Sequence, residues 1–89
     1  MKAKRLMIVG RVQGVGYRAW MSAEAVRLGV SGWVRNAPNG AVEALVYGDL
    51  AAVEELLRAC RLGPPLAEVN SIVEELAEPE PEPGFRVVR

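Results

Sequence analysis

The stretch GRVQGVGYR, residues 10–18, connects a strand-like segment to a helix-like one. Upstream, residues 3–11 alternate in character and predict a β-strand with Leu6 and Ile8 on one face. Within the stretch, Gly14 and Gly16 precede Arg18 at the point where a helix would begin. Such a sequence either forms a plain turn between the two elements or makes room for an anion.

Downstream, apolar side chains recur at helical spacing and predict a helix that Gly29 ends. The stripe consists of Tyr17, Met21, Ala25 and Leu28. Glu24 falls in the same angular sector. We interpret it as a partly buried structural carboxylate, paired with a backbone group or an arginine, and its role is left open.

The middle of the chain predicts a hairpin followed by a second helix. Residues 31–36 and 41–48 alternate as strands. Asn39-Gly40 between them is a strong hairpin signal because both residue types tolerate positive φ. Asp49 is well placed to cap the helix that follows, which Gly63 ends. The apolar stripe of this second helix consists of Val53, Leu56, Leu57 and Cys60.

The last third predicts a strand over residues 69–76, an acidic, proline-rich loop and a short terminal strand in residues 85–89. The order βαββαβ plus a terminal strand predicts a single α+β domain over residues 1–89. It has the ferredoxin-like split βαβ arrangement, an antiparallel sheet with both helices on one face. The first two strands then run parallel with the third between them. Their carboxyl ends share one edge, which brings Arg18 and Asn36 toward one site.

Composition excludes several kinds of chemistry. The 89 residues include one cysteine and no histidine, so an internal disulfide, a zinc-type metal cluster and histidine acid–base catalysis are all excluded. Cys60 lies in an apolar stripe and is interpreted as core. Net charge is zero, with +5 in residues 1–45 and −5 in residues 46–89, so the half that holds the glycines is the basic one.

Partners and compartment are constrained in the same way. The near-neutral charge and the lack of an aromatic-rich strand motif argue against nucleic-acid binding. No apolar run reaches the roughly 20 residues of a membrane span, and the N-terminal apolar run is too short for a signal peptide. We therefore expect a cytoplasmic protein that does not bind membranes. Its small size and the lack of an obvious exposed apolar patch favour a monomer.

The glycine stretch has a physical basis for binding phosphate. Amides at a helix start lack partners within the helix, and the helix dipole favours an anion there. Arg18 would add a forked, charge-assisted contact to two phosphoryl oxygens. The phosphate-binding loop predicted in this way consists of Gly14, Val15, Gly16, Tyr17 and Arg18. From these residues alone, a plain glycine turn remains an even alternative.

Three stretches together resemble the acylphosphatase family: GRVQGVGYR, LGVSGWVRNAPNG and GPPLAEV. The resemblance runs from about Arg5 to Val88 and includes the spacing of the stretches. The family pattern usually has phenylalanine where this chain has Tyr17, and Asp-Gly or Lys-Gly where it has Asn39-Gly40.

The resemblance implies hydrolysis of acyl phosphates to a carboxylate and inorganic phosphate, without a metal or cofactor. It also implies that Arg18 binds the phosphate and that Asn36 positions the attacking water. Two alternatives stay open. The scaffold could bind phosphate or carbamoyl phosphate without turnover, or serve as one domain of a carbamoyl-transfer maturation protein.

Overall fold

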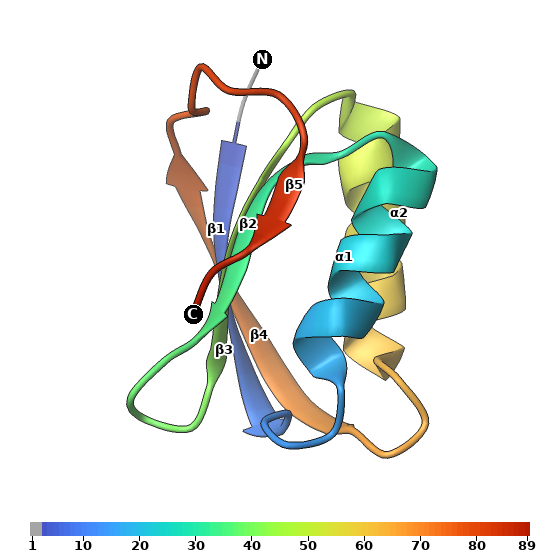
Figure 1. The fold of residues 1–89 in the computed structure, drawn as a ribbon, viewed down its shortest axis with the longest axis vertical. Coiled ribbons are helices and arrows are strands. Elements are labelled where there is room, and N and C mark those ends of the chain that lie inside the picture. The colour runs from blue at the N-terminus through green and yellow to red at the C-terminus, as the bar shows by residue number, and fades with distance from the viewer. Residues whose placement is uncertain (1–2) are drawn as a thin grey trace.

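A computed structural model describes residues 3–89 (Figure 1). Its elements are β1 (Ala3–Arg11), α1 (Tyr17–Leu28), β2 (Ser31–Asn36), β3 (Val42–Tyr47), α2 (Leu50–Leu62), β4 (Glu68–Ala77) and β5 (Phe85–Val87). The predicted order of elements is confirmed, including the short strand at the end. Figure 1 shows both helices packed side by side on one face of the sheet.

The sheet has the order β4-β1-β3-β2-β5, so β3 lies between β1 and β2 as predicted. Val42 of β3 pairs with Ile8 of β1 on one side and with Asn36 of β2 on the other. The carboxyl ends of β1 and β2 therefore flank the same part of β3. This register is what brings the start of α1 and the end of β2 to one edge of the sheet.

The predicted antiparallel sheet needs one correction, because β5 pairs with β2 in parallel. Gly32 pairs with Phe85, Val34 pairs with Val87, and the Val88 amide donates to the Val34 carbonyl at 2.8 Å. The chain reverses direction after β4, which is itself antiparallel to β1. Since β1 and β2 run the same way, the reversed chain has the direction of β2 when it reaches the far edge.

The core lies between the sheet and the helices and contains the predicted stripes. Its buried members include Leu6, Ile8, Tyr17, Met21, Ala25, Val53, Leu56, Leu57 and Cys60. Both helices end at glycines, as predicted. Gly29 has the left-handed φ of 74°, and its amide bonds to carbonyls of the last turn of α1. Gly63 ends α2 with a bond from its amide to the Ala59 carbonyl.

Two local predictions were only partly right. In the hairpin only Gly40 has a positive φ, 91°, whereas Asn39 does not. The Asn39 side chain instead accepts a bond from the Ala41 amide at 3.0 Å. The connection is thus a wider loop over residues 37–41, closed by a bond from the Ala37 amide to the Ala41 carbonyl. Asp49 does occupy the cap position of α2, but its carboxylate makes no capping bond.

The acidic segment 78–84 is fastened to the sheet by several hydrogen bonds, among them two between Gly84 and the start of β2: the Gly84 amide donates to the Ser31 hydroxyl and the Gly32 amide donates to the Gly84 carbonyl. The Trp33 indole donates to the Glu80 carboxylate at 3.0 Å, and the Tyr47 hydroxyl donates to the Glu82 carbonyl at 2.6 Å. These contacts guide the chain from β4 across to the β2 edge, where β5 begins. Neither helix in residues 3–89 is long and apolar enough to cross a bilayer.

Candidate active site

A pocket of about 710 Å³ opens where β1 and β2 end and α1 begins. It is lined by Val12, Gly14, Gly16, Tyr17, Arg18, Ala19, Asn36, Val87, Val88 and Arg89. The fold therefore brings Arg18 and Asn36 to the same pocket. Val15, the other residue of the predicted loop, is not part of the lining, because its side chain packs against the core.

The backbone amides of the glycine loop are free to receive a ligand. The first hydrogen bond of α1 runs from the Trp20 amide to the Gly16 carbonyl at 3.0 Å. Within residues 3–89, the amides of residues 14–19 have no acceptor. Gly14 and Gly16 have left-handed φ values of 73° and 79°. A Cβ added at either would meet nothing within 4 Å, so the backbone conformation, not crowding, is what favours glycine.

The electrostatic character of the pocket is positive. The first turn of α1 carries no acidic residue, so no carboxylate within that turn opposes the positive end of the helix dipole. The Arg18 side chain is partly buried, and it makes no ion pair among the described residues. Because the Arg18 guanidinium does not pair with a carboxylate in this part of the chain, it is available to bind an anion in the pocket.

Asn36 is the last residue of β2, and its exposed side chain lines the pocket. No hydrogen bond of this side chain occurs within the described part of the chain. A carboxamide carries both donors and an acceptor, so it can hold a water molecule in a chosen orientation. Arg35, the preceding residue, points away as expected and pairs with Glu43 at 2.7 Å.

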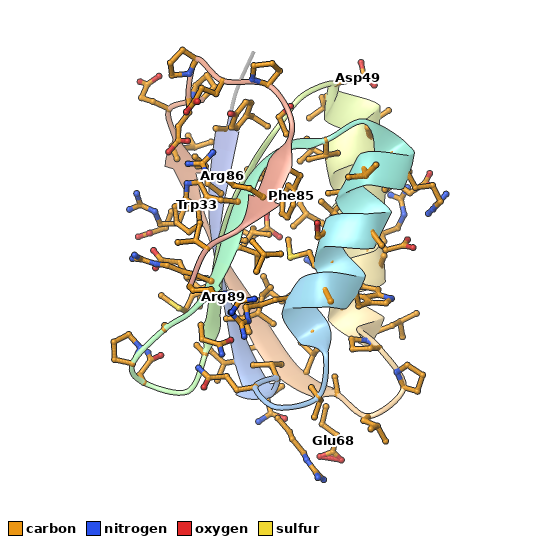
Figure 2. The ribbon with its side chains drawn as sticks, in the orientation of Figure 1. Trp33, Asp49, Glu68, Phe85, Arg86 and Arg89 are labelled. Atoms are coloured by element: carbon orange, nitrogen blue, oxygen red, sulfur yellow. The ribbon has the colours of Figure 1, made fainter. Side chains whose placement is uncertain are left out.

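Sequence reasoning did not place the end of the chain at the pocket. Residues 87–89 reach it because β5 pairs with β2, and continuing that register two residues beyond Val87 brings Arg89 beside Asn36. Figure 2 shows the Arg89 side chain on the side of the sheet that faces the start of α1. The segment FRVVR was recognised as a strand. Assigning it to the β2 edge was the missing step that would have identified a second arginine at the site.

Other reactive side chains are removed from the chemistry by burial or pairing. Burial raises the pKa of the Cys60 thiol to about 11, so it stays protonated and unreactive near neutrality. Burial likewise raises the pKa of Tyr17, whose hydroxyl donates to the Cys60 carbonyl at 2.6 Å. Glu24 pairs with Arg27 at 2.9 Å, in line with the structural role expected of it. Residues 3–89 contain no group of three or more side chains suited to hold a metal.

Comparison with known proteins agrees with this arrangement. A family model described as Acylphosphatase matches residues 4–87. An acylphosphatase from Acidiphilium cryptum is 65% identical over 85 residues, which cover 96% of this chain and 93% of the relative. The crystal structure of acylphosphatase from Bacillus subtilis superposes with a TM-score of 0.95 at 33% identity, covering 100% of both chains. Full-length HypF in its phosphate- and nucleotide-bound form matches 99% of this chain with 12% of its own, at 26% identity and a TM-score of 0.91.

Proposed function

Because the chain belongs to the acylphosphatase family, we propose that the pocket at the start of α1 is where it hydrolyses acyl phosphates. This hydrolase activity breaks the carboxyl–phosphate bond and yields a carboxylate and inorganic phosphate. One observation carries the assignment of the site. One pocket is lined by residues 14 and 16–19, whose amides have no acceptor within residues 3–89, by the Arg18 side chain, which makes no ion pair in that part of the chain, and by Asn36.

The glycine loop and Arg18 hold the phosphoryl group. Amides that converge on an anion at a helix start act as fixed dipoles, which need no rearrangement as charge shifts during the reaction. Arg18 adds a fork of two N–H donors across two phosphoryl oxygens. Arg89 brings a second positive charge to the rim of the same pocket. The protein thus supplies positioning and charge stabilisation, which account for most of the catalysis of phosphoryl transfer.

Asn36 orients the attacking water. A neutral carboxamide cannot take up a proton near pH 7, so its contribution is to hold the water in line with the phosphorus. The proton that the water loses goes to an oxygen of the phosphoryl group. The leaving group is a carboxylate whose conjugate acid has a pKa of about 4 to 5, so it departs without protonation. This chemistry requires neither a general acid nor a metal or cofactor.

We also propose that residues 1–89 act as one domain and as a cytoplasmic monomer. The family match spans residues 4–87, and one copy of the chain supplies Arg18, Asn36 and the glycine loop, which are the groups that the proposed chemistry uses. The lone Cys60 is buried as a free thiol, which is compatible with a reducing compartment. Light scattering coupled to size exclusion and fractionation of the producing cells test these two points.

Kinetics on benzoyl phosphate test the assignment of the site. We expect turnover in the presence of EDTA and competitive inhibition by inorganic phosphate. The substitution Asn36→Ala should lower kcat about 100-fold. The inhibition constant of phosphate should change less than twofold, because the substitution removes the group that orients the attacking water and leaves the phosphate-binding groups in place. Wild-type turnover by this variant would refute the role of Asn36. Phosphate binding without any turnover by the unmodified protein would favour a phosphate- or carbamoyl-phosphate-binding module.

A further inference from the structure

Gln13 ties together the two segments that carry the site. Its side-chain Nε2 donates to the Ala37 carbonyl and to the Ala41 carbonyl, each at 2.9 Å. Within residues 3–89, these are the only two hydrogen bonds between the glycine loop, segment 12–16, and the hairpin loop, segment 37–41. Both N–H groups of the Gln13 carboxamide therefore bond to a segment that is far from Gln13 in the sequence.

The two carbonyls lie at the neck of the hairpin, directly beyond Asn36. The Ala37 amide closes this neck by bonding to the Ala41 carbonyl at 2.8 Å. The remaining bonds of the hairpin loop, from the Gly40 and Ala41 amides, are internal to it. These two bonds shape the hairpin loop but do not fix its position relative to the phosphate-binding amides. The bonds from Gln13 both shape the loop and fix that position.

Gln13 is partly buried and is not among the residues that line the pocket. Because both of its N–H groups bond to the Ala37 and Ala41 carbonyls, we expect an effect of Gln13 on the reaction to pass through the hairpin that it holds. The amides that follow it in the loop bind phosphate through their own backbone geometry. Asn36, which adjoins the bonded Ala37, must keep its carboxamide at a fixed distance from that phosphate.

We propose that Gln13 is a positioning residue that sets the place of Asn36, and hence of the attacking water, relative to the bound phosphoryl group. The proposal rests on the role of Asn36 given under Proposed function. A misplacement of about 1 Å in a reacting group can cost on the order of 100-fold in rate. Partial loosening of the hairpin should cost less than removal of the Asn36 side chain itself.

The first test is Gln13→Met, which keeps the length and volume of the side chain but removes both donors. We expect kcat on benzoyl phosphate to fall about tenfold, with less than a twofold change in the inhibition constant of phosphate. Gln13→Ala, in which water can reach the two carbonyls, should show the same split and serves if methionine fits poorly. Both variants are checked for a single cooperative thermal transition before kinetics.

The second test combines Gln13→Met with Asn36→Ala. If Gln13 acts through Asn36, the double variant has the kcat of Asn36→Ala alone, because no positioned carboxamide remains to be misplaced. A further tenfold loss in the double variant would overturn the proposal. So would wild-type kcat in Gln13→Met, or a loss matched by weaker phosphate inhibition, which would place its effect on the loop.

The two hypotheses fail in different ways. If Asn36 does not orient the water, Asn36→Ala alone retains wild-type turnover, and both the assignment of Asn36 and the role of Gln13 fall. If Asn36→Ala is impaired as expected but the Gln13 variants are unimpaired or additive, only the positioning role of Gln13 is wrong.

Discussion

The two helices begin at opposite ends of the sheet and under opposite conditions (Figures 1 and 2). Helix α1 starts at Gly16, which has a left-handed conformation with φ 79° and ψ 18°, and has no acid in its first turn. Helix α2 starts at Asp49, which has an extended conformation with φ −60° and ψ 133°. Neither start is capped by a side-chain hydrogen bond.

The difference shows that an open helix start is not enough to make an anion site. At α2 the exposed carboxylate of Asp49 offsets the helix dipole and would repel a phosphate. At α1 the glycine loop adds further free amides, and Arg18 and Arg89 line the same pocket. The same backbone dipole is thus left unopposed at one end of the molecule and is countered at the other.

The sharpest way to break this comparison is to remove the arginine next to the free amides. Arg18→Ala should lower kcat about 1000-fold and raise the inhibition constant of phosphate, because the amides alone cannot offset the charge of the phosphoryl group. The matched control is Arg58→Ala, an exposed arginine of α2 without an ion pair among residues 3–89. Equal losses in the two variants, measured on benzoyl phosphate, would mean that only overall charge matters.

A second test compares the two ends of α1. Gly16 and Gly29 have nearly the same left-handed φ, 79° and 74°, and a Cβ at either meets nothing within 4 Å. Alanine should therefore cost about 1 kcal/mol of folding free energy at each position. Only Gly16→Ala shifts amides of the loop, so we expect it alone to raise the inhibition constant of phosphate, about tenfold. Urea denaturation and phosphate inhibition, measured on both variants, check the two halves of this prediction.

The features that depend on residues close together in the sequence, namely the helices and their ends, were predictable. The stripes of both helices follow from apolar spacing, and their ends follow from Gly29 and Gly63, since a left-handed residue after a helix favours glycine. The meeting of Arg18 and Asn36 required one further step, the choice of a split βαβ topology. That step followed from the order of the elements alone.

Features that depend on pairing between distant segments were not predictable. Nothing in residues 85–89 tells which edge of the sheet they join, so the parallel pairing and the place of Arg89 were missed. The two bonds of Gln13 were missed for the same reason, since their acceptors lie 24 and 28 residues away. The residue type of Asn39 permits a positive φ, but Asn39 does not adopt one, and its side chain instead accepts a hydrogen bond from the Ala41 amide.

A third prediction concerns the contact between the start of α1 and the end of α2. The Cys60 carbonyl would normally accept a bond from the amide four residues on, but residue 64 is proline and has no N–H. The Tyr17 hydroxyl supplies the missing donor at 2.6 Å. Tyr17→Phe should therefore lower the free energy of unfolding by about 1 to 2 kcal/mol, measured by urea denaturation, because a buried carbonyl loses its partner.

The activity of Tyr17→Phe should stay within twofold of wild type, since the ring still packs in the core and the loop amides are unchanged. The family pattern, which usually has phenylalanine here, agrees with this expectation. A large fall in kcat without a change in stability would show that the hydroxyl acts on the site instead of on the helix end.

The smallest effect is expected at the start of α2, where Asp49 has the cap position but makes no capping bond. A bonded cap typically contributes about 1 kcal/mol, whereas an exposed charge near a helix start contributes a few tenths. Asp49→Ala should accordingly cost less than about 0.5 kcal/mol in urea denaturation, and the cost should shrink further in high salt because screening weakens the charge–dipole attraction. A loss of 1 kcal/mol that persists in high salt would mean that the carboxylate does bond to the first turn. The contrast between the helix starts would then be one of capped against uncapped amides, and not of charge.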